Sequence, residues 1–438
     1  MRTRRISDKL GAAAAVGAIA ITAGCTSGGP ASNSSSSTHA PASPSSPASP
    51  TATAPGNGQA SPRAPSQAQR AAQAVQGSAA VPTSAQLAAL RAQSAEIAKL
   101  SPEQMAGQRI IYSYNGLSAP SGLLSLIRHG DVGGVIFFSF NIASQQQLAH
   151  VISQMIAANA SAQNPARHYP LLLMTDQEGG LVRRMPWAGP AEAEAQIGAS
   201  ANPAAAASTA GSQAAAGLRA AGMNVNLTPV LDVFRQPGDF DDQFHRSYSM
   251  NPKIVSQAGA AFVRAQQAGR VAATAKHFPG LGAATAAQNT DDGPVTINVD
   301  AGTLRSVDES PYPAAIAAGV KLVMLSWATY PAFDRRLPAG LSPTIVQGEL
   351  QRRLGFRGVT ITDALGAGAL GAFGSLQNKT MLAARAGLDA LLCTAVKPLP
   401  GWKCRDGVQA GLTSGALPKT AFEGQLAQLL ELRASLPT

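Results

Sequence analysis

The chain has 438 residues, of which 45% are hydrophobic and 13% charged, and its formal net charge is +10 at pH 7. This hydrophobic content is ample for a sizeable core, so a wholly disordered chain is excluded, and the length suits one large barrel or about two or three smaller domains. The Lys and Arg residues are dispersed and are not interleaved with aromatic residues, which argues against nucleic acid as a partner.

Residues 1–24 have the features of a signal peptide. Positive charges within residues 1–9 precede an apolar stretch at 10–21 that is too short to span a bilayer as a helix. The stretch ends in ITAGC, where small residues precede Cys25 as they do in signals for bacterial lipoproteins. We expect lipidation of Cys25 and a membrane anchor that holds the protein outside the cytoplasm. The alternative is ordinary signal cleavage and secretion.

Residues 25–85 are predicted to form a disordered tether. Between 26 and 82 the chain consists almost wholly of Ser, Pro, Ala, Thr, Gly and Gln. A segment of this composition buries too little apolar surface to offset its chain entropy, and it acts as a flexible spacer. The folded domain is therefore expected in residues 86–438.

From Leu100 onward, short apolar runs alternate with longer helical patterns, which predicts βα units and a parallel sheet. Eight strands are expected, at 109–113, 134–138, 171–175, 224–230, 271–276, 321–326, 359–362 and 390–394. Helices are expected at 102–108, 144–157, 252–268, 301–318, 343–354 and 419–433, and Ser342 is a candidate N-cap for the fifth. Eight such units favour a (β/α)8 TIM barrel in a single domain. An open doubly wound sheet is the alternative fold.

Charged side chains follow several of these strands. Asp176 follows the third strand, Asp232 follows the fourth, Lys276 and His277 end the fifth, and Asp363 ends the seventh. Any one of them could merely solvate a strand end. Active sites of such barrels lie at the carboxyl ends of the strands, so a cluster on that rim predicts a functional site.

Two cysteines lie outside the leader, at positions 393 and 404. In an exported chain, a pair so close in sequence is expected to form a disulfide that closes a short loop. The alternative is two free buried thiols. The spacing of Cys and His residues does not match a metal site, so neither a metal nor a cofactor is expected.

Several motifs then occur in a fixed order. They are MTDQEGGLVRRM at 174–185, NLTPVLDV at 226–233, KHFPGLG at 276–282 and VTITDAL at 359–365. With GGVIFFSFNI at 133–142 and DDQFHRSYSMNP at 241–252, the sequence resembles glycoside hydrolase family 3, in particular its single-domain bacterial β-N-acetylhexosaminidases. The resemblance covers residues 100 to about 400. It implies a carbohydrate substrate and hydrolysis of terminal β-N-acetylhexosaminides with retention.

The resemblance also implies residue roles. Asp363 matches the nucleophile, a carboxylate that attacks the anomeric carbon and forms a covalent glycosyl ester. The residues matched to contacts with the terminal sugar are Asp176, Arg246, Lys276 and His277. A carboxylate accepts hydrogen bonds from two hydroxyls and a lysine supplies donors, so these residue types suit a polyol. Asp232 could contact the sugar or merely brace the rim.

The chain departs from the family in the loop after the fifth strand. There the family hexosaminidases carry a segment of the type GHGDTxxDSH, whose Asp and His form the general acid/base dyad, whereas this chain reads GLGAATAAQNTDDGPV. An ungapped match puts Asn289 on the family histidine. A gapped match puts Asp291 on the family aspartate and Gly293 on the histidine. The dyad is broken in either match, and the segment after the eighth strand is too short for the second domain that supplies the acid in other members.

The general acid is therefore expected to be Asp291 or Asp292, with Asp291 favoured by the gapped match, or else His245 or Glu309, or to be missing. An active exo-β-glycosidase is the main hypothesis. A β-glucosidase, a glycoside phosphorylase and a sugar-binding lipoprotein without turnover are the alternatives. The presence of Asp363 argues against the last of these, because binding alone needs no nucleophile.

Overall fold

The computed structural model describes residues 93–395 and 397–437. The expected signal peptide (1–24), Cys25 and the expected tether (25–85) lie outside these residues. A helix long and apolar enough to cross a membrane is not found in the described part.

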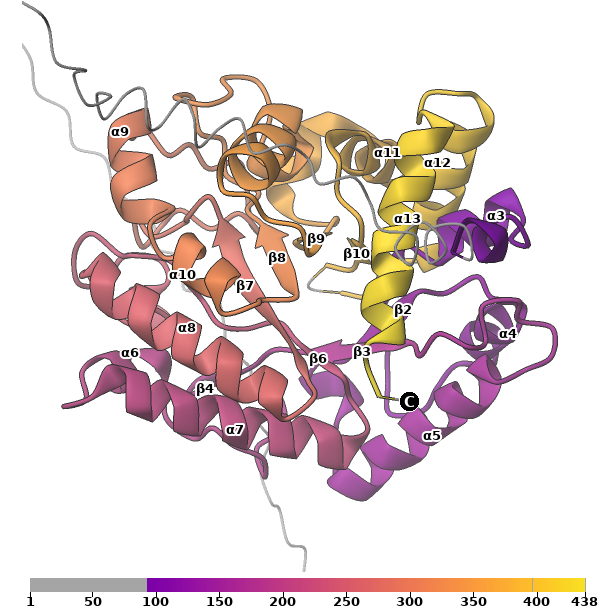
Figure 1. The fold of residues 1–438 in the computed structure, drawn as a ribbon, viewed down its shortest axis with the longest axis horizontal. Helices are drawn as coiled ribbons and strands as arrows, with labels where there is room; N and C mark the ends of the chain where they lie inside the picture. The colour runs from indigo at the N-terminus through magenta and orange to yellow at the C-terminus, as the bar shows by residue number, and fades with distance from the viewer. Residues whose placement is uncertain (1–92, 396, 438) are drawn as a thin grey trace, which may run out of the picture. The chain divides into compact units, whose positions relative to one another are not determined.

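Eight parallel strands form a closed barrel, as the sequence predicts (Figure 1). They are β1 (Ile110–Tyr112), β2 (Gly134–Ile136), β3 (Leu172–Thr175), β6 (Val225–Asn226), β7 (Ala272–Phe278), β8 (Leu322–Leu325), β9 (Val359–Thr362) and β10 (Leu391–Cys393). Each strand pairs with the next in this order, and β10 pairs with β1. A parallel bridge between Ile361 and Ala390 joins β9 to β10. This bridge closes the ring, so the open-sheet alternative is wrong.

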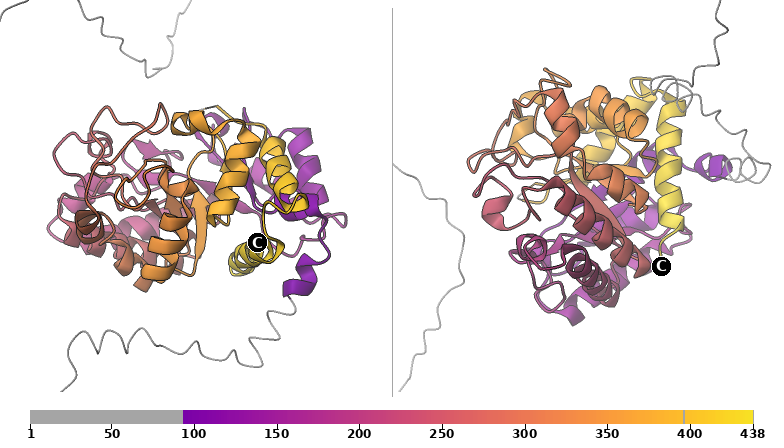
Figure 2. Two further views of the ribbon diagram at one scale, coloured as in Figure 1. Left: turned by 90° about the horizontal axis from the view of Figure 1, so that it is seen from above. Right: turned by 60° about the vertical axis from the view of Figure 1, so that its left-hand side comes forward.

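Helices surround the barrel (Figure 2). The principal ones are α3 (Pro102–Gly107), α4 (Ser121–His129), α5 (Gln145–Asn159), α7 (Pro203–Ala221), α8 (Pro252–Ala268), η5 (Thr344–Arg353), α11 (Leu376–Ala386), α12 (Gly401–Thr413) and α13 (Lys419–Ala434). Side-chain caps define several starts. The Ser144 hydroxyl accepts the Gln147 N–H at the start of α5, and the Ser342 hydroxyl accepts the Ile345 N–H at 3.3 Å beside η5.

Two predicted elements differ from the structure. The helix expected at 301–318 is divided into α9 (Ala301–Thr303), the wide helical turn η3 (Leu304–Asp308) and α10 (Tyr312–Ala317). Pro311, which lacks an N–H, falls at the break. The strand expected at 224–230 ends at Asn226, and Val230 then forms an isolated bridge to Lys276.

The core has two layers because successive strand residues point to opposite faces. Residues such as Leu172, Met174, Leu322 and Met324 fill the barrel interior, and the alternate residues pack under the helices. Helix α13 closes the amino-terminal end of the barrel. Its buried Arg433 donates to the Pro170 carbonyl at 2.7 Å, just before β3. The opposite end, where the strands terminate, stays available for a cavity.

A disulfide joins Cys393, the last residue of β10, to Cys404 in α12. Both residues are fully buried. The bond ties α12 to the strand end, where Thr394 and Ala395 begin one wall of the cavity described below.

Candidate active site

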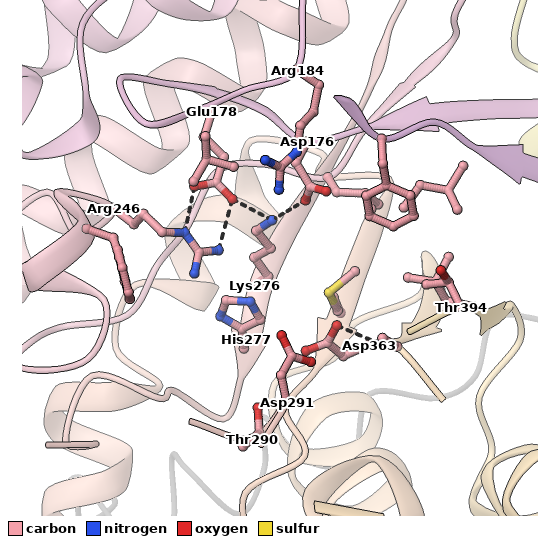
Figure 3. A pocket seen from close by; sticks show the side chains of 18 of the residues that line it. Asp176, Glu178, Arg184, Arg246, Lys276, His277, Thr290, Asp291, Asp363 and Thr394 are labelled. Carbon is pink, nitrogen blue, oxygen red and sulfur yellow. Dashed lines mark hydrogen bonds and ion pairs between the residues drawn. The ribbon is translucent and has the colours of Figure 1, made fainter. Parts of the chain in front are cut away.

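A cavity of about 500 Å³ lies at the carboxyl ends of the barrel strands. The structure brings six of the predicted residues to its lining: Asp176, Arg246, Lys276, His277, Asp291 and Asp363 (Figure 3). They come from segments far apart in the sequence, because parallel strands deliver all their carboxyl ends to one face.

One wall of the cavity is a buried network of ion pairs. Lys276 Nζ lies 2.8 Å from Asp176 Oδ1 and 2.7 Å from Glu178 Oε1. Arg246 holds Glu178 through two bonds of 2.9 Å, and its Nη1 lies 2.9 Å from Asp241 Oδ1. The side chains of Lys276 and Glu178 are each 2% exposed. We call Asp176, Glu178, Arg246 and Lys276 the ionic wall.

The charges of the ionic wall stabilise one another. Burial alone would raise the pKa of Glu178, but the neighbouring Arg246 and Lys276 outweigh it and hold that pKa well below its usual range. Burial would likewise lower the pKa of Lys276, but Asp176 and Glu178 raise it. Glu178 and Lys276 therefore stay ionised at neutral pH. The wall presents fixed donors and acceptors, and removal of either member of such a pair leaves a buried charge without a partner.

Asp232 lies behind this wall and supports His277. Its Oδ2 is 2.7 Å from His277 Nδ1, and its Oδ1 accepts the Leu281 N–H at 2.6 Å. Asp232 is fully buried and is not among the residues that line the cavity, so of the two roles considered for it the structure favours the brace. Burial would lower the pKa of His277, but the Asp232 carboxylate raises it.

Asp232, Asp241 and His277 also bring possible metal-ligand atoms within 4.8 Å of one another. Asp232 is already bonded to His277 and Leu281, and one oxygen of Asp241 is bonded to Arg246. The second oxygen of Asp241, Oδ2, is buried without a hydrogen-bond partner among the described residues.

Asp363 stands in a turn that is fixed on several sides. It directly follows β9, and one of its oxygens accepts the Ala364 N–H at 2.6 Å. The Trp327 indole donates to the Ala364 carbonyl at 2.9 Å, and the Gly366 N–H donates to the Thr394 carbonyl at 2.9 Å. The carboxylate is therefore held at a defined place in the cavity.

The loop 279–298, which follows β7, carries Asp291 to a position facing Asp363 (Figure 3). Asn289 shapes the turn: its Oδ1 accepts the Asp291 N–H at 3.0 Å, and its Nδ2 donates to Asp292 Oδ2 at 2.8 Å. Asp291 is exposed as a residue, but desolvation of its carboxyl group at the cavity, together with the negative charge of Asp363, raises the pKa of Asp291 to about 6. A carboxyl group with this pKa can be protonated near neutral pH and can donate that proton.

The other expected sources of the acid do not line the cavity in the described part of the chain. Asp292 is exposed and bonds to Asn289, and His245 ends the short helix η2 (Asp242–Phe244). Glu309 is buried and paired with Arg353. Among the candidates in the described residues, Asp291 is therefore the one whose position suits the acid.

Sequence reasoning missed Glu178 and Arg184. Glu178 lies two residues after Asp176, and residues at this spacing share a face of an extended chain, so a signal was available. Arg184 follows the hairpin of β4 (Gln177–Gly179) and β5 (Val182–Arg183) and enters the cavity near Asp176 (Figure 3). Its Nε is buried without a hydrogen-bond partner among the described residues, so it can serve a bound ligand.

Aromatic side chains line the cavity at two places that sequence reasoning also missed. Phe138 stacks on Phe140 with a ring separation of 5.4 Å, and Phe240 packs edge-on against Phe244 at 5.8 Å. Phe140 and Phe244 are 37% and 42% exposed. These rings give the cavity an apolar surface beside its ionic wall.

A closed parallel barrel whose open end holds a polar cavity and two facing carboxyl groups is the arrangement of a glycoside hydrolase. Residues 116–432 match the model of the glycosyl hydrolase family 3 N-terminal domain. The chain belongs to this family and is a glycoside hydrolase.

Known proteins agree with this assignment. An uncharacterized secreted glycosyl hydrolase of Arthroderma benhamiae is 43% identical over 331 residues, which cover 76% of this chain and 93% of that protein. A family 3 β-N-acetylglucosaminidase from Paenibacillus is 32% identical with a TM-score of 0.71, over 77% of this chain and 63% of that one. A β-N-acetylhexosaminidase from Beutenbergia cavernae is 30% identical with a TM-score of 0.66, over 77% of this chain and 99% of that one.

Proposed function

We propose that the protein is a retaining exo-β-glycosidase that hydrolyses terminal β-N-acetylhexosaminides of cell-wall or chitin type. The observation that carries this proposal is the placement of Asp291 opposite Asp363 in a cavity with a wall suited to sugar hydroxyls. The names of the solved relatives from Paenibacillus and Beutenbergia support the choice of N-acetylhexosamine over glucose.

The two carboxyl groups divide the chemistry. Protonated Asp291 donates its proton to the glycosidic oxygen while Asp363 attacks the anomeric carbon, so the aglycone leaves as an alcohol and the sugar remains as an ester on Asp363. Because this ester is uncharged, the pKa of Asp291 falls once it forms. Asp291 can then accept a proton from the water that attacks the anomeric carbon. Hydrolysis releases the sugar with its β-configuration retained.

The ionic wall is suited to hold the terminal sugar during both steps. Asp176, whose side chain is 15% exposed, offers carboxylate oxygens to hydroxyls, and Lys276 and Arg184 offer donors. Since these groups are fixed before substrate arrives, little reorganisation is needed during the reaction.

A panel of aryl β-glycosides that differ only at the sugar tests the substrate. We expect kcat/KM to be highest for the N-acetylhexosaminides, and a preference for the glucoside would reject that part of the proposal. Product analysis with and without phosphate distinguishes hydrolysis from phosphorolysis. The absence of turnover on every glycoside would favour a sugar-binding lipoprotein instead.

Trapping tests the mechanism. Asp291→Ala with an aryl substrate should accumulate protein heavier by one sugar residue, because loss of the base slows hydrolysis of the ester. The double variant with Asp363→Asn should show no such adduct. An adduct in the double variant would mean that another residue is the nucleophile.

We further propose that the protein is exported and anchored through a lipid on Cys25. The support is the ITAGC ending of the apolar leader and the secreted relative from Arthroderma. Fractionation of cells that express the wild type and Cys25→Ala tests the anchor. The wild type should be found with membranes and the variant should not, and equal solubility of the two would reject lipidation.

A further inference from the structure

The segment that follows the nucleophile also contacts the loop that carries the acid. The Gly368 N–H donates to the Asp291 carbonyl at 2.8 Å, and the Ala369 N–H donates to the Thr290 carbonyl at 3.0 Å. Gly368 and Ala369 begin the 3-10 helix η6 (Gly368–Phe373), which follows Asp363 closely in the chain. One short piece of backbone therefore connects the positions of the two carboxyl groups.

Gly368 lies so close to the loop that the Cβ atom of any other residue would collide with the loop backbone. A Cβ atom built on it would be 2.4 Å from the Asp292 carbonyl oxygen and 2.8 Å from the Asp291 carbonyl oxygen. Both are backbone atoms, so they cannot turn aside as the end of a flexible side chain can. The φ angle of Gly368 lies outside the left-handed region, so what the position requires is space and not an unusual conformation.

The remaining contacts of the loop are farther from the acid. The Ala284 carbonyl accepts the Phe240 N–H at 2.9 Å near one end of the loop, and the Ile297 N–H donates to the Thr329 carbonyl at 2.9 Å near the other. Asn289 folds the turn internally. The bonds from Gly368 and Ala369 thus position the Asp291 backbone itself.

We propose that Gly368 is a positioning residue that sets the distance between Asp291 and Asp363 by allowing direct contact of the two backbones. Retention requires carboxyl groups about 5 to 5.5 Å apart. The turn that carries the nucleophile is already fixed by the bonds of Ala364 to Trp327 and of Gly366 to Thr394, so displacement of the loop moves the acid alone. Misplacement of a reacting group by about 1 Å can reduce the rate about 100-fold. This inference rests on the proposed role of Asp291.

The test compares Gly368→Ala with Gly371→Ala. Gly371 belongs to the same 3-10 helix, but a Cβ there would meet nothing within 4 Å in the described structure. Both variants are assayed with aryl glycosides of increasing leaving-group pKa and with a disaccharide. We expect Gly368→Ala to lose about 10- to 100-fold on the disaccharide and less than about threefold on the best aryl leaving group, which needs little protonation. Gly371→Ala should match the wild type on both.

The outcomes separate the inference from the function on which it rests. If Gly368→Ala matches Gly371→Ala across the series while Asp291→Ala shows a steep dependence, the acid is correct and the positioning role is wrong. Equal loss on good and poor leaving groups would indicate a general structural role and would also overturn the inference. If Asp291→Ala itself shows no added dependence, the proposed acid is wrong.

A second variant covers the case in which Gly368→Ala does not fold. Ala369→Pro removes the N–H that bonds to the Thr290 carbonyl but adds no atom next to Asp292 at position 368, and proline is tolerated in the first turn of a helix. It should show the same selective loss on poor leaving groups at smaller amplitude. Wild-type behaviour throughout the series would count against the positioning of the loop by this segment.

Discussion

The ionic wall and the loop 279–298 face the same cavity but are built in different ways. The wall consists of largely buried side chains from the segment after β3, from the loop after β6 and from β7, joined by ion pairs of 2.7 to 2.9 Å. The loop presents Asp291 from an exposed turn that is held by Asn289 and by backbone bonds. In the wall, charge partners fix each functional group, whereas in the loop the backbone does so.

The difference shows which part of the site can change without loss of the fold. A change in the wall leaves an unpaired buried charge, which is strongly unfavourable. A change at the exposed turn of the loop, where Asp291 and Asp292 lie, alters solvent-facing residues and leaves the barrel intact. The departure from the family Asp-His dyad therefore lies in the tolerant region, whereas the ionic wall keeps the residues of the family motifs.

Asp363→Asn should have the largest effect, because neither region can compensate for a missing nucleophile. We expect a loss of kcat of several orders of magnitude, about 10⁴-fold or more, for every leaving group. The unfolding temperature should stay close to that of the wild type, since the amide oxygen of the introduced Asn can still accept the hydrogen bond from the Ala364 N–H. Activity within about tenfold of the wild type would assign the nucleophile to another residue.

Asp291→Ala should show that the loop acts on departure of the aglycone. We expect losses of about 10² to 10⁴-fold on disaccharides and alkyl glycosides and much smaller first-step losses on nitrophenyl-type glycosides. Asp292→Ala is the matched control, because its carboxylate is exposed and bonds to Asn289. Superimposable plots of rate against leaving-group pKa for the wild type and both variants would exclude both aspartates as the acid.

The sequence predicted the charged residues at the strand ends better than the loop. The positions of Asp176, Lys276, His277 and Asp363 followed from strand ends, because apolar periodicity shows where each strand stops. The pairing of Glu178 with Arg246 did not follow, since these residues are 68 positions apart and meet only after the barrel closes. The eight strands were predicted for the same reason as these strand-end residues, because a buried strand has a run of apolar residues that can be recognised in the sequence.

The gapped sequence match favoured Asp291 over Asp292, but the residues themselves gave no physical reason for this choice. The two are adjacent and chemically identical, and what distinguishes them in the structure is that Asp291 lines the cavity and faces Asp363, whereas Asp292 does not line it. The break in the helix expected at 301–318 was also missed, because the apolar pattern continues across it. Its residues keep an apolar face on both sides of Pro311, so periodicity alone did not show the interruption.

Arg246→Ala tests the ionic wall. The loss of activity in this variant should not depend on the leaving group. Loss of the guanidinium leaves Glu178 and Asp241 with fewer partners, so we expect KM to rise about 10- to 100-fold and the unfolding temperature to fall. The proportional loss should be equal for aryl glycosides and disaccharides. A loss confined to poor leaving groups would place Arg246 in the proton-transfer step and would remove the functional contrast between the two regions.

The dependence of activity on pH should distinguish Asp291 from Asp292 as the acid. In the proposed mechanism Asp291 donates a proton, so it must be protonated in the free enzyme, and with a pKa of about 6 its protonated fraction falls as the pH rises through that value. We therefore expect kcat/KM for a disaccharide to decline about tenfold per pH unit above about pH 6. In Asp291→Ala this decline should disappear, while in Asp292→Ala it should remain.

The charge of Asp363 provides a direct check of the same assignment. It is the second cause, after burial, of the raised pKa of Asp291, so Asp363→Asn should lower that pKa. Because that variant is expected to be inactive, the titration has to be followed by NMR of the Asp291 carboxyl carbon, with Asp291→Asn used to assign the signal. A midpoint that stays near 6 in Asp363→Asn would mean that burial alone sets the pKa. In that case Asp291 would remain an acid after the sugar is attached to Asp363, and another group would have to accept the proton of the attacking water.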